Sequence, residues 1–130
     1  MASEAVKALI VDDSGVSRKL AIRFLKLSEW AQFEFAEASG GQEALDALEN
    51  DQFEYLFVDW NMLDMTGGDL IHALEKRGDG TELYIVVMTT QQRAPVIEDF
   101  LTSCSLKTAY IRKPFKEDEL RAVLSEVTGR

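Results

Sequence analysis

Three aspartates stand directly after two apolar segments of the chain. Asp12 and Asp13 follow the apolar residues 8–11, and Asp59 follows the apolar residues 55–58. Both segments are typical of buried parallel strands, and ligands of open α/β sheets collect at the carboxyl ends of such strands. If the two strands are neighbours, three carboxylates converge at one edge of the sheet. Because like charges repel, this cluster is expected to bind a divalent cation or to take up protons.

Two further polar residues stand at predicted strand ends. Thr89 ends an apolar segment, and Lys113 closely follows the short segment 109–111. With Asp59 as the nucleophile, the set is typical of phosphoryl transfer to a carboxylate, since aspartate forms acyl-phosphate intermediates. Mg²⁺ held by one or two carboxylates would bridge to phosphoryl oxygens. The ammonium of Lys113 and the hydroxyl of Thr89 would contact the remaining oxygens.

The elements that position these residues alternate regularly along the chain. Apolar and β-branched residues predict strands at 7–12, 33–38, 55–58, 84–88 and 109–111. Helices are predicted at 15–29, from Gly40-Gly41 through Asn50, after Gly67-Gly68, from about Pro95, and at 116–128. The strand at 33–38 alternates apolar and polar residues, which favours the sheet edge. Strict alternation of this kind predicts a parallel sheet with helices on both faces and one domain over residues 1–130.

Helical spacing also predicts which faces are buried. In the first helix one face is marked by Val16, Leu20, Phe24 and Leu27, and in the last helix by Leu120, Val123, Leu124 and Val127.

Composition excludes several classes of protein. Fourteen Lys and Arg against 23 Asp and Glu give a net charge of −9, which argues against direct nucleic-acid binding and favours partners with basic patches. No apolar run approaches the roughly 20 residues of a membrane helix. The single Cys104 has no intrachain disulfide partner, so a cytoplasmic location is expected.

These residues, in this order, resemble the response-regulator receiver domains of two-component signalling over nearly the whole chain. Residues 38–45 (ASGGQEAL) and Met65-Thr66-Gly67 are similar to the supporting motifs of that family, and Lys113-Pro114 to its lysine–proline pair. Residues 59–62, together with Tyr110, look most like single-domain chemotaxis receivers. The resemblance implies a flavodoxin-like, doubly wound sheet of five parallel strands in the order 2-1-3-4-5, with five helices.

The resemblance also implies roles at the acidic cluster. Asp59 would accept a phosphoryl group from a histidine kinase or a phosphotransfer protein and lose it slowly by self-dephosphorylation. Mg²⁺ would contact Asp13, Asp59 and the backbone carbonyl of Asn61, with Asp12 acting mainly through water. Lys113 would contact the phosphoryl group.

Further roles concern switching and access. Thr89 would move toward the phosphoryl group and Tyr110 would turn into the vacated space. This would change the surface of the fourth helix, fifth strand and fifth helix, which a downstream target binds. Asn61, Thr90 and Gln91 would flank the path of attacking water.

Some positions depart from the family pattern. Leu63 replaces the usual proline four residues after the acceptor, and Thr90 replaces a usually small residue. Leu106-Lys107 replaces the usual Gly-Ala before the fifth strand, and the segment between Thr89 and Lys113 is about two residues longer than usual.

Three other functional contexts share parts of this pattern. A receiver belonging to a longer regulator with an output domain fits the same residues. A Mg²⁺-dependent phosphohydrolase of the haloacid-dehalogenase type would need a second acid where Asn61 stands. In a flavin mononucleotide binder, Asp12 and Asp13 would repel the phosphate.

Overall fold

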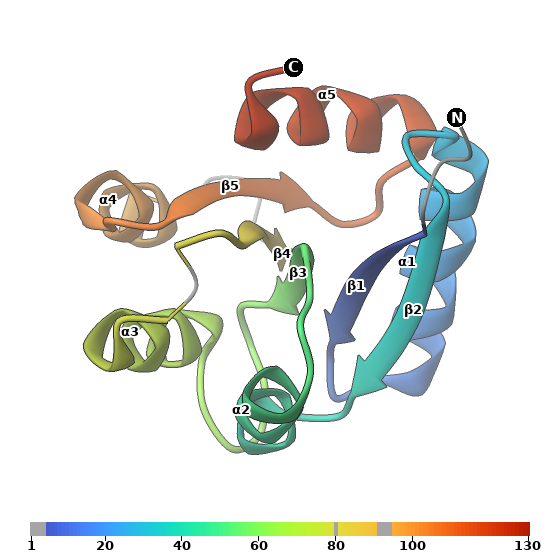
Figure 1. Ribbon diagram of the computed structural model, residues 1–130. Helices are drawn as coiled ribbons and strands as arrows, with labels where there is room; N and C mark the ends of the chain where they lie inside the picture. Colours follow the sequence, from blue (N-terminus) through green and yellow to red (C-terminus); the bar gives the residue numbers. More distant parts are fainter. Residues whose placement is uncertain (1–4, 80, 91–94) are drawn as a thin grey trace.

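Parallel strands alternate with helices along the described part of the chain, and the strands form one sheet in the order β2-β1-β3-β4-β5 (Figure 1). The computed structural model describes residues 5–79, 81–90 and 95–130. Within these residues the strands are β1 (Val6–Val11), β2 (Phe33–Ala38), β3 (Tyr55–Asp59), β4 (Tyr84–Thr89) and β5 (Lys107–Arg112). The helices are α1 (Gly15–Ser28), α2 (Gly41–Asn50), α3 (Gly67–Arg77), α4 (Pro95–Ser103) and α5 (Glu117–Thr128).

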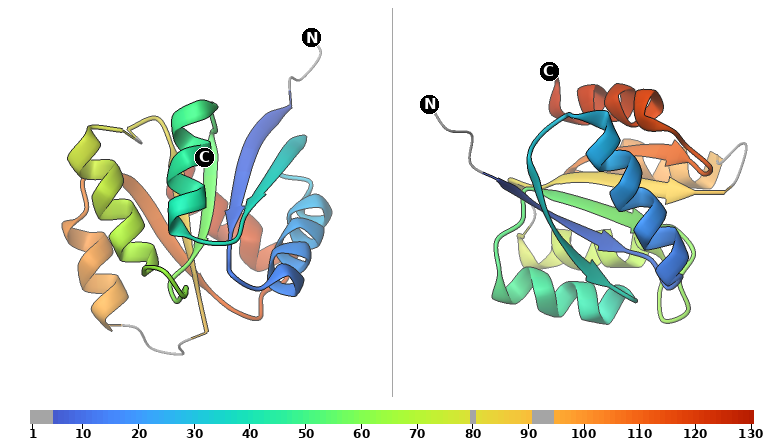
Figure 2. Two further views of the ribbon diagram at one scale, coloured as in Figure 1. Left: turned by 90° about the horizontal axis from the view of Figure 1, so that it is seen from below. Right: turned by 90° about the vertical axis from the view of Figure 1, so that its right-hand side faces the viewer.

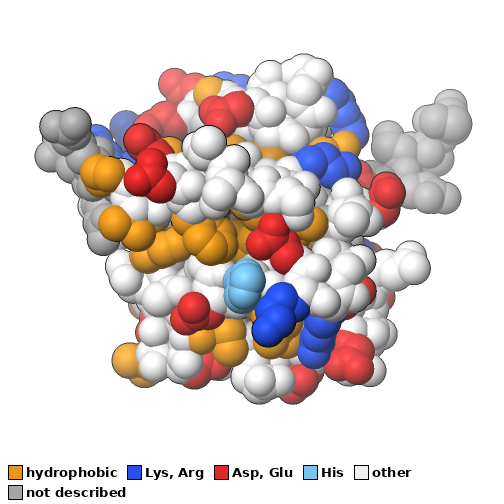
Figure 3. Space-filling model, turned by 90° about the vertical axis from the view of Figure 1, so that its left-hand side faces the viewer, with side chains coloured by type: hydrophobic (Ala, Val, Ile, Leu, Met, Phe, Trp, Pro, Cys, Tyr) orange, Lys and Arg blue, Asp and Glu red, His pale blue; other side chains and the backbone are white. Residues whose placement is uncertain are grey.

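Helices cover both faces of this sheet. α1 and α5 pack on one face, through residues such as Leu25 and Leu124, and α2, α3 and α4 pack on the other, through Leu70 and Ile97 (Figure 2). On the outer side of α3 and α4, hydrophobic side chains form a band between charged groups (Figure 3). Among the described residues, every helix is too short or too polar to span a lipid bilayer.

The predicted architecture is confirmed. The sheet has the order 2-1-3-4-5, and β2 lies at its edge as its alternating pattern predicted. All residues of β3 are buried, as are all but the first of β4, because helices cover both faces at these positions. β5 is longer than the predicted 109–111. Its additional residues are polar and lie at an open edge, where burial does not select apolar side chains.

The predicted buried face of α1 is wrong in part. Val16 is 73% exposed, and Leu20 and Leu27 are about half exposed at 48% and 49%. Only Phe24 of the predicted face packs inward, where its ring meets Phe115 edge-on.

The buried stripe of α1 is instead formed by Ala21, Leu25 and Ser28. Burial of Ser28 is compatible with an apolar interior because its hydroxyl donates to the carbonyl of Leu25 at 2.6 Å within the same helix. The sequence pattern favoured the larger apolar residues and could not anticipate that two small residues would face the core.

This assignment predicts a large difference between two leucines of one helix. Leu25→Ala should lower the free energy of unfolding by about 2–5 kcal/mol, because it opens a cavity at a fully buried position. Leu27→Ala should lower it by less than about 1 kcal/mol, because half of the side chain is already in solvent. Urea denaturation of both variants measures the difference. Equal losses would show that the outward stripe is also part of the core.

Candidate functional site

The carboxylates of Asp12, Asp13 and Asp59 lie together at the carboxyl edge of the sheet. β1 and β3 are neighbours, and their register pairs Val11 with Val58, so Asp12 and Asp59 follow at the same level. One oxygen of each of the three carboxylates lies within 4.8 Å of the others. Asp12 and Asp59 are buried, whereas Asp13 is exposed. The cluster thus has two buried acids and one acid open to solvent.

Lys113 brings a positive charge into this cluster. Its Nζ donates to Asp12 Oδ2 at 2.8 Å and lies 3.3 Å from Asp59 Oδ1. The strand end that carries Lys113 is fixed against β4, because the Lys113 backbone N–H donates to the carbonyl of Thr89 at 2.6 Å. Thr89 itself is fully buried at the end of β4. The ends of β1, β3, β4 and β5 therefore contribute to one site.

The electrostatics differ between the two buried acids. The pKa of Asp59 is raised to about 6, chiefly by burial and in part by the charges of Asp12 and Asp13, and Lys113 only partly offsets these effects. Burial also acts on Asp12, but hydrogen bonds from Lys113, from the backbone of Ser14 and from Ser17 outweigh it and lower the pKa of Asp12. Asp12 is therefore the carboxylate that stays ionised and paired with Lys113, while the negative charge of Asp59 is only partly balanced.

The pKa of Lys113 is shifted in the direction that keeps its charge. Burial alone would lower this pKa, but hydrogen bonds and charges from Asp12 and Asp59 raise it above its usual value. The ammonium therefore stays protonated near neutral pH.

The loop after β3 folds back beneath Asp59. The N–H of Gly67 donates to the carbonyl of Trp60 at 2.8 Å, and Asn61 and Thr66 form an antiparallel bridge. A Cβ at Gly67 would lie 3.0 Å from the Asp59 carbonyl oxygen, so a larger residue would displace the backbone that carries the acid. Thr66 then caps α3. As predicted, the glycine pair starts a helix.

Ser17 belongs to the site but was not predicted. Its hydroxyl accepts from Lys113 Nζ at 3.0 Å. Ser14, whose side chain accepts from the Ser17 backbone N–H at 3.2 Å, is the N-cap of α1. Ser17 stands in the first turn of a helix that begins shortly after two strand-end aspartates, so its backbone lies near the same edge of the sheet. That position is the signal in the sequence that would have identified it.

The positions expected to control access of water differ in what the structure describes. Asn61 and Thr90 are exposed, and Gln91 lies outside the described residues. Thr90 lines an apolar pocket of about 250 Å³ together with Lys113, Leu20 and Phe115.

Tyr110 takes part in a separate contact at the outer edge of the sheet. Its hydroxyl donates to Glu98 Oε1 of α4 at 2.5 Å. Tyr110 lies on β5, and Lys113 of the site directly follows the same strand.

Comparison with known proteins agrees with the fold. The family model described as the response regulator receiver domain matches residues 8–125. The chain belongs to this family of two-component signalling proteins.

Its relatives include chemotaxis proteins of the single-domain type, as the resemblance predicted. The chain is 30% identical over 126 residues to the chemotaxis protein CheY of Pseudomonas aeruginosa, covering 96% of this chain and 98% of that protein. It is 32% identical to CheY1 of Helicobacter pylori, covering 95% and 98% of the two chains. The chain is therefore a CheY-like receiver.

Solved structures show the same arrangement. Chemotaxis protein CheY4 of Vibrio cholerae superposes with a TM-score of 0.80 at 26% identity, over 95% of this chain and 99% of that one. A probable two-component response regulator with a GGDEF domain also superposes with a TM-score of 0.80 at 25% identity, over 95% of this chain and 49% of that one.

The raised pKa of Asp59 predicts a pH-dependent stability. Its folded-state pKa of about 6 lies above the ordinary aspartate value of 3.8, so the folded protein holds this proton to higher pH than the unfolded chain. The contribution of Asp59 is complete below about pH 4 and is lost as pH rises through about 6. Asp59→Asn, which carries no charge, should therefore stabilise the metal-free protein near pH 7 by on the order of 2 kcal/mol, and should have little effect near pH 4.

Urea denaturation in a chelator at the two pH values measures this difference. Asp99→Asn, at an exposed position of α4, removes the same charge and serves as the control. If the wild type were as stable as Asp59→Asn near neutral pH, this would contradict the claim that the ionised carboxylate of Asp59 destabilises the folded protein.

Proposed function

We propose that the protein is a phosphorylation-dependent signalling switch in which Asp59 accepts the phosphoryl group with Mg²⁺ as cofactor. The observation that supports this most directly is the buried Asp59 carboxylate, which lies beside Lys113 and within reach of two further carboxylates. The membership of the chain in the receiver family supports the same function. We place the protein in the cytoplasm, where its phosphodonors would also be.

The donor set fits a divalent cation such as Mg²⁺. Its oxygen ligands are of the type that Mg²⁺ prefers, and their three negative charges exceed the single positive charge of Lys113. Asp13, Asp59 and the backbone carbonyl of Asn61 would contact the ion directly, and Asp12 through water. When bound, Mg²⁺ neutralises charge on the phosphoryl oxygens.

Asp59 would act as the nucleophile. One carboxylate oxygen forms a bond to phosphorus while the bond from phosphorus to the donor nitrogen of a phosphohistidine breaks, and that nitrogen leaves with the bonding electrons. Lys113 stays charged at this site and stabilises the transferred oxygens, while Thr89 supplies a hydroxyl. Asp59 would accept one phosphoryl group, as a switch does, and would then lose it by slow hydrolysis. Thr90 and Asn61, exposed beside the site, would limit the approach of water, together with Gln91.

The phosphodonor would dock on α1. Val16 and Leu20 are exposed on its first turns, and Leu20 also lines the apolar pocket that reaches Lys113 and Thr90. An apolar surface at this place can bind the donor protein while its phosphohistidine approaches Asp59. Val16 and Leu20, which were expected to be buried, would thus contribute to binding of the phosphodonor.

Switching would pass from Thr89 to Tyr110. A phosphoryl group on Asp59 favours movement of Thr89 toward it, and the vacated space admits Tyr110, which now donates to Glu98 of α4. The surface formed by α4, β5 and α5 would change and control a downstream target protein. Phosphorylation moves this equilibrium only through contacts that differ between the two states.

The same chemistry would operate in a protein of either length. The solved relatives include a chain that this one matches over 99% of its length and another that it matches over 49%. A longer regulator with an output domain is therefore the alternative context for this receiver.

Binding of Mg²⁺ should be detectable before any phosphorylation. Millimolar Mg²⁺ should raise the melting temperature, since an ion that binds only the folded state stabilises it, by about 2.7 kcal/mol at a hundredfold excess over Kd. Asp13→Asn should weaken the shift, because it removes one charge and one ligand, whereas Asp99→Asn should leave it unchanged. Trp60 fluorescence in a Trp30→Phe background gives a second measurement. The absence of any response to Mg²⁺ would contradict the metal assignment.

Phosphorylation tests the proposed function directly. Incubation with acetyl phosphate and Mg²⁺ should add one phosphoryl group to the wild type and none to Asp59→Asn, as measured by intact-protein mass spectrometry. Asp99→Asn should gain the group like the wild type. A stable adduct in Asp59→Asn, on Ser14 or Thr90 for example, would overturn the assignment of the acceptor.

A further inference from the structure

A groove of about 380 Å³ lies between α4, β5 and α5. Leu101 and Ala109 contribute apolar surface to it, and Glu98 and Glu126 contribute carboxylates from the two helices. Its described lining contains neither lysine nor arginine. The groove therefore combines an apolar surface with uncompensated negative charge, on a protein whose net charge is −9.

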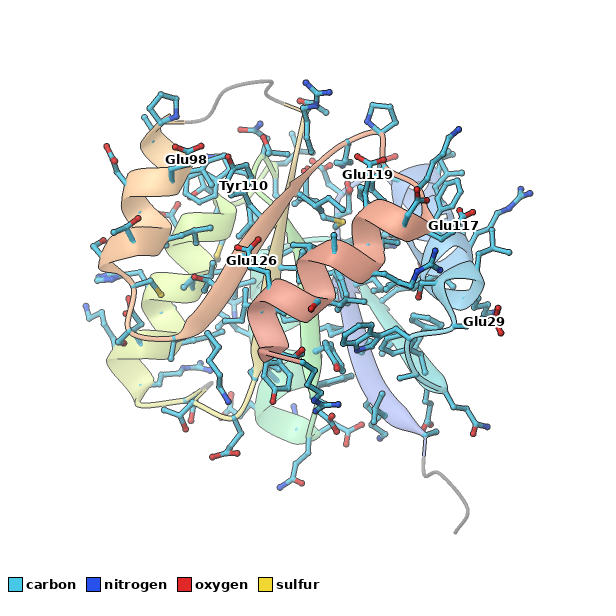
Figure 4. The ribbon with its side chains drawn as sticks, turned by 90° about the horizontal axis from the view of Figure 1, so that it is seen from above. Glu29, Glu98, Tyr110, Glu117, Glu119 and Glu126 are labelled. Atoms are coloured by element: carbon cyan, nitrogen blue, oxygen red, sulfur yellow. The ribbon has the colours of Figure 1, made fainter. Side chains whose placement is uncertain are left out.

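Tyr110 connects the groove to the switch. Figure 4 shows its ring on β5, with Glu98 on α4 beside it and Glu126 on α5. Its hydroxyl donates to Glu98 Oε1 at 2.5 Å. This hydrogen bond raises the pKa of Tyr110, and burial and the charges of Glu98 and Glu126 raise it further, so both carboxylates act on the same phenol.

We infer that this groove binds an arginine or lysine side chain of the downstream partner, and that it does so most tightly when Tyr110 has released Glu98. The inference rests on the proposed function, because it gives the chemistry of the partner that the switch controls. The apolar surface receives the methylene stem of the basic side chain, and the two carboxylates bind its charged end.

The hydrogen bond from Tyr110 makes this binding depend on the state of the switch. In the described conformation the phenol hydroxyl and an incoming N–H group compete for Glu98 Oε1. Once Tyr110 turns away, Glu98 has lost this donor, and a cation restores a charge-assisted hydrogen bond. The partner thus has more favourable contacts with the switched state, which is the condition for coupling.

Charge complementarity determines the kind of partner. An acidic peptide would meet two like charges in the groove, and a purely apolar one would leave both carboxylates unpaired as it displaced water from them. A segment with alternating apolar and basic residues satisfies both parts of the lining.

The test uses a defined probe, a blocked tetrapeptide of two leucines and two arginines, with a matched peptide in which glutamates replace the arginines. NMR titration of the unphosphorylated full chain should shift amides of the groove with the basic peptide only. Glu98→Gln and Glu126→Gln should each weaken binding by about fivefold, since each removes half of the opposing charge. Glu29→Gln, which removes the same charge at the far end of α1 (Figure 4), should change it by less than about twofold.

Tyr110→Phe separates this inference from the proposed function. It removes the hydroxyl that occupies Glu98, so it should bind the basic peptide about threefold more tightly than the wild type without any phosphorylation. Phosphorylation of the wild type should have an effect in the same direction.

The outcomes are distinct. Binding that maps outside the groove, or that Glu29→Gln weakens as much as Glu98→Gln does, overturns the inference even if Asp59 is phosphorylated normally. Weaker or equal binding by Tyr110→Phe overturns the state dependence. If Asp59 accepts no phosphoryl group but the variants behave as expected, the proposed function fails and the basic-ligand groove stands.

Discussion

The ammonium group of Lys113 is the charge on which the rest of the site depends. It lies 2.8 Å from Asp12 and 3.3 Å from Asp59, and it is the counter-ion that permits two acids to be buried side by side. One positive charge does not balance three carboxylates, and the pKa of Asp59 is raised to about 6, chiefly by burial and in part by the charges of Asp12 and Asp13. A site with this imbalance favours an added cation and can then receive an anionic phosphoryl group. The chemistry of the site is thus a consequence of incomplete neutralisation.

The position of Lys113 directly after β5 links this charge to the outer surface. The backbone N–H of Lys113 donates to Thr89 at the end of β4, and Tyr110, three residues before Lys113, lies on β5 and contacts Glu98 of α4. A change in the contacts of Thr89 therefore acts on a short segment that carries both a site residue and the tyrosine of the surface groove. The path is short and consists of adjacent backbone and side-chain contacts, so the two ends need only a small displacement to influence one another.

How much of this could be predicted from sequence differs with the kind of contact. The strands and their terminal acids were predictable because an apolar run that ends in aspartate indicates a buried parallel strand with the acid at its carboxyl end. The buried face of α1 was not, because Ser28 satisfies its hydroxyl within the helix and Val16 remains outside the core. The Tyr110–Glu98 hydrogen bond was also beyond sequence reasoning, since it depends on how closely α4 approaches β5 and on a side-chain rotamer. Local pattern determines strand ends, whereas helix orientation and surface contacts are tertiary properties.

The two proposed binding surfaces differ in physical character, and this difference has a functional consequence. The stripe on α1 is apolar and lies beside the site, so burial of apolar surface would contribute to holding a phosphodonor there. The groove between α4, β5 and α5 is acidic, so a target held there is attracted over a longer distance and is sensitive to salt. A basic target would gain little affinity from the apolar stripe of Val16 and Leu20. A donor that docks on that stripe would gain little affinity from Glu98 and Glu126. The acidic lining of the groove and the apolar side chains of the stripe therefore favour different partners, so the input and output partners of the switch would not compete for the same face.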